Sequence, residues 1–454
     1  MSDPAHTRVL TEARRAPEVL GLLAVCGALA VLVNYKPIYA LGLALVILGL
    51  GVYTASPFVV VAAAIPGTLL VSRIGGSTND SNLSVSDLLL LVSTCAALPY
   101  MRLRESPALR KILGAMTIYE GTLLLTVALN PYRANVIEWV HEMFLFGGSL
   151  IVGFAVARHG HARRALATFV GGSLLIAAAT CVVAVATHFR PVFLAGGLNK
   201  NFIGTMLMFA FLVVLANPDW VGWTGRWRVP AMILLLLGIL GAQSRQAMIG
   251  CAVAVVVVSL CGGGSGRRSR IVILGLIPIA IGATLSIVSE FSSSNHLNSV
   301  YVRLSAYSQS LQVWHISPWL GVGLRWWYTA RFPNSFQPPN AEFEMLTSAG
   351  MIGLAAFLYL QGRTLLELWL LPRRFAVLAF TAVLVRLVEG QFDIFWVTAS
   401  SAIPLLLAGL ALGEHSRSPT MRAVASSGFP PDEFRPESST VSHFPRTYEI
   451  SPLA

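Results

Sequence analysis

Charged residues are scarce in this chain of 454 residues. They make up 12% of it, whereas hydrophobic residues make up 55%. In soluble globular proteins, charged residues alone account for about a quarter of the chain, so the composition excludes an ordinary water-soluble globule. Apolar runs of ~20 residues, the length that a helix needs to cross hydrocarbon, recur along most of the sequence. These runs predict an all-α, polytopic bundle of about 12–14 transmembrane spans with one large extracytoplasmic loop.

The predicted spans are apolar segments separated by short polar turns, and several of them are short. They are residues 18–34, 37–54, 57–72, 85–99, 112–129, 136–157, 165–187, 201–217, 229–243, 246–261, 271–289, 342–361, 375–388 and 393–412. The sequence therefore divides into five parts. Residues 1–17 form a cytoplasmic N-terminus, and residues 18–289 form the first part of the bundle. Residues 290–341 form the loop, residues 342–413 the second part of the bundle, and residues 414–454 a disordered cytoplasmic tail.

Cysteine is also rare, and the common catalytic motifs are missing. The five cysteines all fall within or at the ends of apolar runs, where they behave as small hydrophobic residues rather than as a disulfide or metal framework. HExxH, a P-loop and a GxSxG elbow do not occur. Glu138, His141 and Glu142 lie close together, and a glutamate three residues before a histidine occurs in di-iron sites. Such a site needs a second copy of this motif, which the sequence does not contain. We expect these three residues to hydrogen-bond between helices, and we predict neither a metal nor a cofactor.

The net charge of +11 is explained by its distribution along the chain. About two thirds of the 32 Lys and Arg residues fall on one side of the predicted membrane. Positive residues beside a span resist translocation, so this side is cytoplasmic. The pattern predicts a multi-pass plasma-membrane protein with both termini in the cytoplasm and the 290–341 loop outside. The lipid bilayer is then the partner of the basic residues, and no nucleic acid is expected.

The 290–341 loop is unusually long and rich in tryptophan, which argues for an ordered cap over the outer face. Residues 302–316 have the composition of a helix lying on the surface. The glycines of "GVGLR" favour a tight turn, because this short pattern alone is too weak to indicate a phosphate loop.

Several cations and amides gather at the predicted outer ends of the spans. Arg245 lies in the turn "GAQSRQAMIG", and Asn199, Lys200 and Asn201 begin the span after "AGGL". Arginine suits phosphate because its planar group donates two hydrogen bonds. Simpler roles remain open for each residue: attraction to lipid headgroups for the cations, and helix capping for the asparagines.

In their order along the chain, "LNKNFIG", "SRQA" and a loop reading "R…PWLGVG…PPN…E…TSAGMIGL" resemble the O-antigen ligase and Wzy polymerase superfamily. The resemblance covers about residues 195–361, and the spans before it match only in hydropathy. It implies a metal-independent inverting glycosyltransferase that uses a polyprenyl-pyrophosphate-linked glycan as donor and a sugar hydroxyl as acceptor, outside the plasma membrane. Arg245 and Arg303 would then stabilise the pyrophosphate, with substrate binding by Asn199, Lys200, Asn201, Arg190, Arg325 and Asn340.

The chain departs from the family pattern at one position. Pro339 stands before Asn340 where the family usually has His-Asn, and that histidine is the proposed base of the family. Glu342 or Glu344 has the reach to replace it, with His315 and His296 as further alternatives. Two rival hypotheses stay open: a transporter or flippase for a lipid-linked or charged solute, and a catalytically inactive partner in envelope polysaccharide assembly. The sequence does not separate ligase from polymerase.

Overall fold

The computed structural model describes residues 54–73, 83–101, 106–261, 299–332, 335 and 337–418. Within these ranges the chain is helical and forms no strand, apart from two isolated β-bridges. The all-α prediction is therefore confirmed for the described residues. Several predictions lie outside the described residues: the N-terminus 1–17, the spans 18–34 and 271–289, span 37–54 apart from Thr54, His296, and the tail beyond residue 418.

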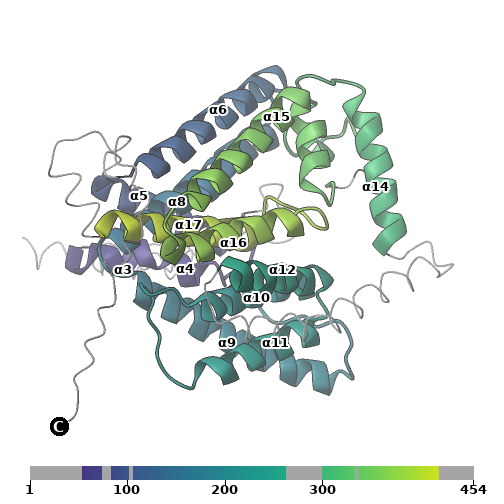
Figure 1. Ribbon diagram of the computed structural model, residues 1–454. Helices are drawn as coiled ribbons and strands as arrows, with labels where there is room; N and C mark the ends of the chain where they lie inside the picture. Colours follow the sequence, from purple (N-terminus) through teal and green to yellow (C-terminus); the bar gives the residue numbers. More distant parts are fainter. Residues whose placement is uncertain are drawn as a thin grey trace, which may run out of the picture.

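Each predicted span within the described ranges overlaps helical structure, with the spans 57–72 and 393–412 only in part (Figure 1). The helices, in chain order, are α3 (Pro57–Ala62), α4 (Ala64–Gly67), α5 (Val85–Ala97), α6 (Pro107–Leu129), α7 (Arg133–Met143), α8 (Ser149–Arg158), α9 (Ala162–Ala186), α10 (Lys200–Ala216), α11 (Arg228–Ala242), α12 (Arg245–Cys261), α14 (Ser299–Trp314), α15 (Ala341–Trp369), α16 (Arg373–Glu389) and α17 (Thr398–Arg417). A π-helical turn, Phe144–Gly148, joins α7 to α8.

Four of the described helical stretches are long and apolar enough to cross a membrane. They are α6, the continuous stretch Arg133–Arg158, α9 and α15. Several other apolar helices, including α10, α11 and α12, have 10–17 residues. A helix of that length spans at most ~25 Å, less than the ~30 Å of the hydrocarbon layer. The chain is a helical membrane protein, and its full-length spans within the described residues are fewer than the sequence predicts.

Helix α17 runs through the centre of the bundle and is buried along almost its whole length. A helix that is buried on all sides needs no polar face, which explains the apolar stretch of residues 402–413. Its glycines let it touch the backbone of α8: a β-carbon on Gly409 would overlap the carbonyl of Leu150, and one on Gly153 of α8 would overlap that of Leu406. Small residues at such contacts are typical of membrane helix pairs.

The predicted surface helix is present as α14. It lies across the end of the bundle at which α15 begins (Figure 1). The ring of Tyr307 stacks on Phe343 of α15, with 4.9 Å between the ring centroids. This contact fixes the described part of the 290–341 loop against the bundle.

The turn after α14 docks onto a kink in α15. Gly350 has φ 69° and ψ −166°, which divides α15 into two helical parts. At this kink, the N–H of Met351 donates to the carbonyl of Pro318 at 2.9 Å, and the N–H of Val322 donates to that of Thr347 at 3.0 Å. Gly321 lies in the same turn with φ 69°, so the expected tight turn is confirmed. The kink therefore positions the segment that leads to Arg325.

Replacing Gly350 by alanine is expected to lower the unfolding free energy by about 3 kcal/mol, because positive φ disfavours a side chain. A β-carbon would also overlap the backbone of Trp319. Gly362 in the same helix is the matched control, since nothing lies within 4 Å of its β-carbon position. Gly362→Ala should be neutral or stabilising. Denaturant unfolding in micelles measures both variants, and equal effects would contradict this account of the kink.

Candidate functional site

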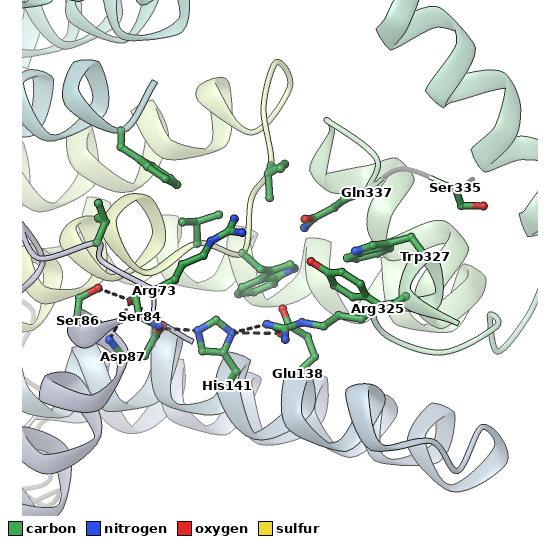
Figure 2. Close-up of a pocket in the computed structure, with 16 residues that line it drawn as sticks. Arg73, Ser84, Ser86, Asp87, Glu138, His141, Arg325, Trp327, Ser335 and Gln337 are labelled. Carbon is green, nitrogen blue, oxygen red and sulfur yellow. Dashed lines mark hydrogen bonds and ion pairs between the residues drawn. The ribbon is translucent and has the colours of Figure 1, made fainter. Parts of the chain in front are cut away.

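A cavity of about 330 Å³ opens at the end of the bundle where α15 begins (Figure 2). Its wall is formed by parts of the chain that are distant in sequence. The charged residues of the wall are Arg73, Asp87, Glu138, His141 and Arg325, and its aromatic residues are Phe202, Trp327, Tyr328 and Trp396. Mixed polar and aromatic walls of this kind are typical of small-molecule sites.

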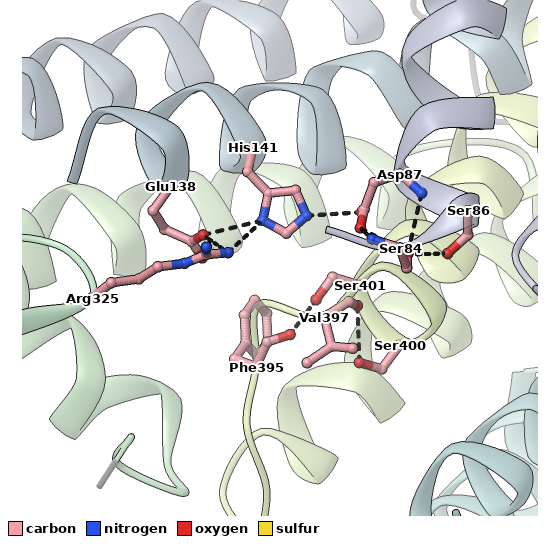
Figure 3. A network of polar contacts seen from close by, with 10 residues as sticks. All are labelled: Ser84, Ser86, Asp87, Glu138, His141, Arg325, Phe395, Val397, Ser400 and Ser401. Carbon is pink, nitrogen blue, oxygen red and sulfur yellow. Dashed lines mark hydrogen bonds and ion pairs between the residues drawn. The ribbon is translucent and has the colours of Figure 1, made fainter. Parts of the chain in front are cut away.

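Four of these charged side chains form a continuous chain of contacts (Figure 3). Arg325 pairs with Oε2 of Glu138, and the same oxygen lies 3.2 Å from Nδ1 of His141. Nε2 of His141 lies 2.8 Å from Oδ1 of Asp87. None of the four side chains is more than 9% exposed. Water therefore cannot replace these partners, and each charge depends on its neighbour.

The contacts of His141 indicate its charge. Carboxylate oxygens only accept hydrogen bonds, and both ring nitrogens of His141 face carboxylates, those of Glu138 and Asp87. This arrangement favours the imidazolium form of the ring, in which both nitrogens donate. Together with Arg325 it balances the two carboxylates, which is the arrangement that makes burial of four charges tolerable.

Asp87 is held in place by the start of its own helix. The backbone N–H of Ser84 donates to Oδ2 of Asp87 at 2.6 Å, and the Ser84 hydroxyl accepts from the Asp87 N–H at 3.3 Å. This is a capping box, in which the two residues satisfy each other's free donors. It leaves Oδ1 of Asp87 for His141.

Arg325 is positioned by the start of α7. Its backbone has the left-handed φ of 53°. The preceding residue, Leu324, donates its N–H to Oδ1 of Asn135 at 2.8 Å and accepts from the hydroxyl of Tyr132 at 2.6 Å. Burial raises the pKa of Tyr132 above its usual range, so the hydroxyl remains a donor. These two hydrogen bonds fix the backbone before Arg325, so that its side chain lies against Glu138 on α7.

A second polar group lies deeper in the bundle. The hydroxyl of Tyr119 on α6 donates to Oε2 of Glu142 at 2.5 Å, one helical turn beyond Glu138. Both carboxylate oxygens of Glu120 are buried without a hydrogen-bond partner in the described part of the chain. The expectation of hydrogen bonds between helices is confirmed for His141, which reaches α5, and for Glu142, which reaches α6. Glu138 instead contacts His141 of its own helix and Arg325, which lies outside the helices.

Of the ten residues predicted for the site, Arg325 alone lines the cavity. Glu344 lies next to it: Gln337, which does line the cavity, donates to Oε1 of Glu344 at 2.9 Å. The other oxygen of Glu344 is buried and has no hydrogen-bond partner among the described residues. Glu344 is therefore connected to the cavity wall through the side-chain amide of Gln337.

Asn340 and Glu342 meet at Gln391, in the segment after α16. The side-chain amide of Asn340 donates to Oε1 of Gln391 at 3.2 Å, and that of Gln391 donates to Oε1 of Glu342 at 2.7 Å. Asn340 also caps α15, because its side chain accepts from the N–H of Phe343 at 2.9 Å. The nearby Pro339 provides no base.

Asn199 caps α10, where its side chain accepts from the N–H groups of Asn201 and Phe202, both at 3.0 Å. Asn201 instead reaches Asp393, to which its side-chain amide donates at 3.3 Å. The same carboxylate oxygen accepts from Gln246 at 2.7 Å. The starts of α10 and α12 are therefore joined at one acidic residue.

Arg245 begins α12 beside Gln246, and Lys200 begins α10. Arg303 lies on α14 one turn before Tyr307. Burial raises the pKa of Tyr307; Arg303 lowers this pKa and Glu342 raises it, so both charges lie within range of the hydroxyl. Arg190 is exposed in the segment after α9 and does not line the cavity.

Sequence reasoning missed Asp87 and Arg73 as site residues. The Ser84 and Asp87 spacing is a capping signal that marks the helix start. It does not indicate that Oδ1 of Asp87 meets a histidine 54 residues away. Arg73 appears in the sequence only as one of several outer cations.

No group of three or more His, Cys, Asp or Glu residues in the described ranges is arranged to hold a metal ion. No protein-family model and no curated protein matches this chain. The site is therefore interpreted from its own geometry and from the motifs of the sequence.

Proposed function

We propose that this membrane protein is a glycosyltransferase of the O-antigen ligase and polymerase type, acting at the outer face of the plasma membrane. One observation carries the proposal. Motif residues that are distant in sequence gather at a single end of an apolar bundle, beside the cavity: Asn201 and Gln246 share Asp393, and the N–H of Ala341 donates to the carbonyl of Gly390 at 2.9 Å. Such convergence of polar groups at one end of a bundle is typical of a binding site.

In the proposed reaction, a hydroxyl of the acceptor sugar attacks the anomeric carbon of the donor. The bond between that carbon and the pyrophosphate oxygen breaks, and the polyprenyl pyrophosphate leaves with the electron pair. Arg245 and Arg303 stabilise the negative charge that develops on it. Glu344 is favoured over Glu342 as the base, because its donor Gln337 lines the cavity, whereas Glu342 is held by Gln391.

A transporter for a lipid-linked or charged solute is the second candidate. Buried carboxyl groups within spans, such as Glu120 and Glu142, favour it because ionisable residues at membrane depth commonly line solute or proton paths. It shares the proposed orientation, with both termini in the cytoplasm and the 290–341 segment outside.

One assay separates the two functions. Proteoliposomes containing the full chain receive a labelled polyprenyl-pyrophosphate oligosaccharide and an acceptor glycan. A glycosyltransferase yields a transferred or lengthened glycan, and the product length distinguishes one-step ligation from polymerisation. Movement of the intact lipid-linked glycan across the bilayer, without any transfer, would refute the glycosyltransferase and support the transporter.

A further inference from the structure

Among the described residues of the cavity wall, positive charges outnumber negative charges by one. Arg73, Arg325 and the imidazolium of His141 supply three cations, whereas Asp87 and Glu138 supply two anions. The cavity is therefore suited to a ligand with a single negative charge.

Arg73 is the cation that remains for a ligand. Arg325 pairs with Glu138, and His141 lies between Glu138 and Asp87. Arg73 is exposed and forms a β-bridge with Ser84, and its side chain lines the cavity on the side of Ser84 (Figure 2). No carboxylate in the described ranges forms an ion pair with it. A planar guanidinium binds a carboxylate through two parallel hydrogen bonds.

The rest of the wall suits a sugar ring. Trp327 is half-buried and Tyr328 is 45% exposed, so both present ring surface against which the apolar C–H face of a sugar can pack. Trp396 also lines the cavity, although it is only 3% exposed. A volume of about 330 Å³ is at the small end for ligand sites, which favours a ligand of one or two sugar residues.

We propose that this cavity binds a sugar that carries one carboxylate, a uronic-acid unit, with Arg73 facing the carboxylate. The inference rests on the proposed function, since it describes one sugar of the glycan on which the enzyme would act. A pyrophosphate fits the cavity less well. It carries at least two negative charges, whereas the described wall has an excess of one positive charge.

Binding of free sugars to the purified full-length chain in detergent micelles tests the inference. Titration calorimetry compares glucuronic acid, glucose and inorganic pyrophosphate. We expect glucuronic acid to bind at least about tenfold more tightly than glucose, the gain that a charge-assisted hydrogen bond gives. Pyrophosphate should not displace it. Equal affinities for the two sugars, no binding of either, or displacement by pyrophosphate would overturn the inference.

Arg73→Gln should reduce the affinity for glucuronic acid to that for glucose, and Arg73→Lys should retain part of the preference. Arg133→Gln is the matched control, because Arg133 is an exposed arginine near the same end of the bundle and does not line the cavity. It should leave both affinities unchanged. Trp327→Ala should lower the affinities for glucuronic acid and for glucose by the same factor. An Arg73→Gln protein that melts like the wild type and still prefers glucuronic acid would contradict the role of Arg73.

These measurements need no lipid-linked donor, so they are independent of glycan transfer. A protein that binds glucuronic acid but transfers nothing in proteoliposomes would leave the cavity assignment standing and refute the proposed glycosyltransferase. A protein that transfers glycan but does not discriminate between the two sugars would refute the cavity assignment alone.

Discussion

Arg303→Ala and Arg245→Ala are each expected to lower the rate of glycan transfer at saturating donor by about 100-fold. The leaving pyrophosphate gains negative charge in the transition state, and removal of one fixed donor to such a charge typically costs about 100-fold to 1,000-fold in turnover. The proteoliposome assay measures the rate. The lysine variant at each position should recover part of it, because the charge returns without the planar fork.

Arg133→Ala is the control for this experiment. Arg133 is exposed at the start of α7 and lies outside the proposed machinery, so its removal changes the outer charge without removing a predicted contact with the donor. Its rate should equal that of the wild type. A rate for Arg245→Ala and Arg303→Ala that also equals the wild-type rate, in proteins that remain folded, would refute the assignment of the pyrophosphate site.

Glu138→Gln should lower the unfolding free energy by about 3–5 kcal/mol, the usual cost of removing one partner from a buried ion pair. The variant leaves Arg325 and the imidazolium of His141 with Asp87 as the remaining carboxylate of the chain of contacts. Two largely buried cations then face one anion. Denaturant unfolding in detergent micelles measures the change.

Glu120→Gln provides a matched control for this prediction. Glu120 is also a buried glutamate in a span, at 8% exposure, but its carboxyl oxygens have no hydrogen-bond partner in the described part of the chain. Replacing it by the neutral amide removes no ion pair, and we expect a change below ~1 kcal/mol. Similar losses in both variants would show that the Glu138 pairs contribute no specific stability.

Features that depend on neighbouring residues were predictable. Asn199 and Asn340 cap their helices because each side chain reaches an N–H two or three residues ahead. The glycines of "GVGLR" form the expected tight turn, with φ of 69° at Gly321 and 106° at Gly323. The surface helix expected at 302–316 is observed as α14, Ser299–Trp314.

The number of full-length spans was harder to predict. An apolar run indicates burial, but it does not distinguish burial in lipid from burial in protein. Helix α17 illustrates the difficulty, since its apolar sequence is explained by contact with α8 and its other neighbours. Short helices such as α11 and α12 have the composition of spans without their length.

The cavity could not be predicted, because it depends on contacts between distant parts of the chain. His141 and Asp87 are 54 residues apart, and His141 and Arg325 are 184 apart. The sequence contains each residue type, but many arginines and carboxylates at the outer ends would have been equally good partners. Glu344 shows the same limit: its nearness to the cavity depends on Gln337.

By itself, the sequence determined that this is a helical membrane protein, where its helices lie and which residues cap them. These properties follow from composition, periodicity and hydrogen bonds within one helical turn. The tertiary structure decided which charges meet. Burial removes water as a partner, so the chain from Arg325 to Asp87 is stable only when packing brings all its members together.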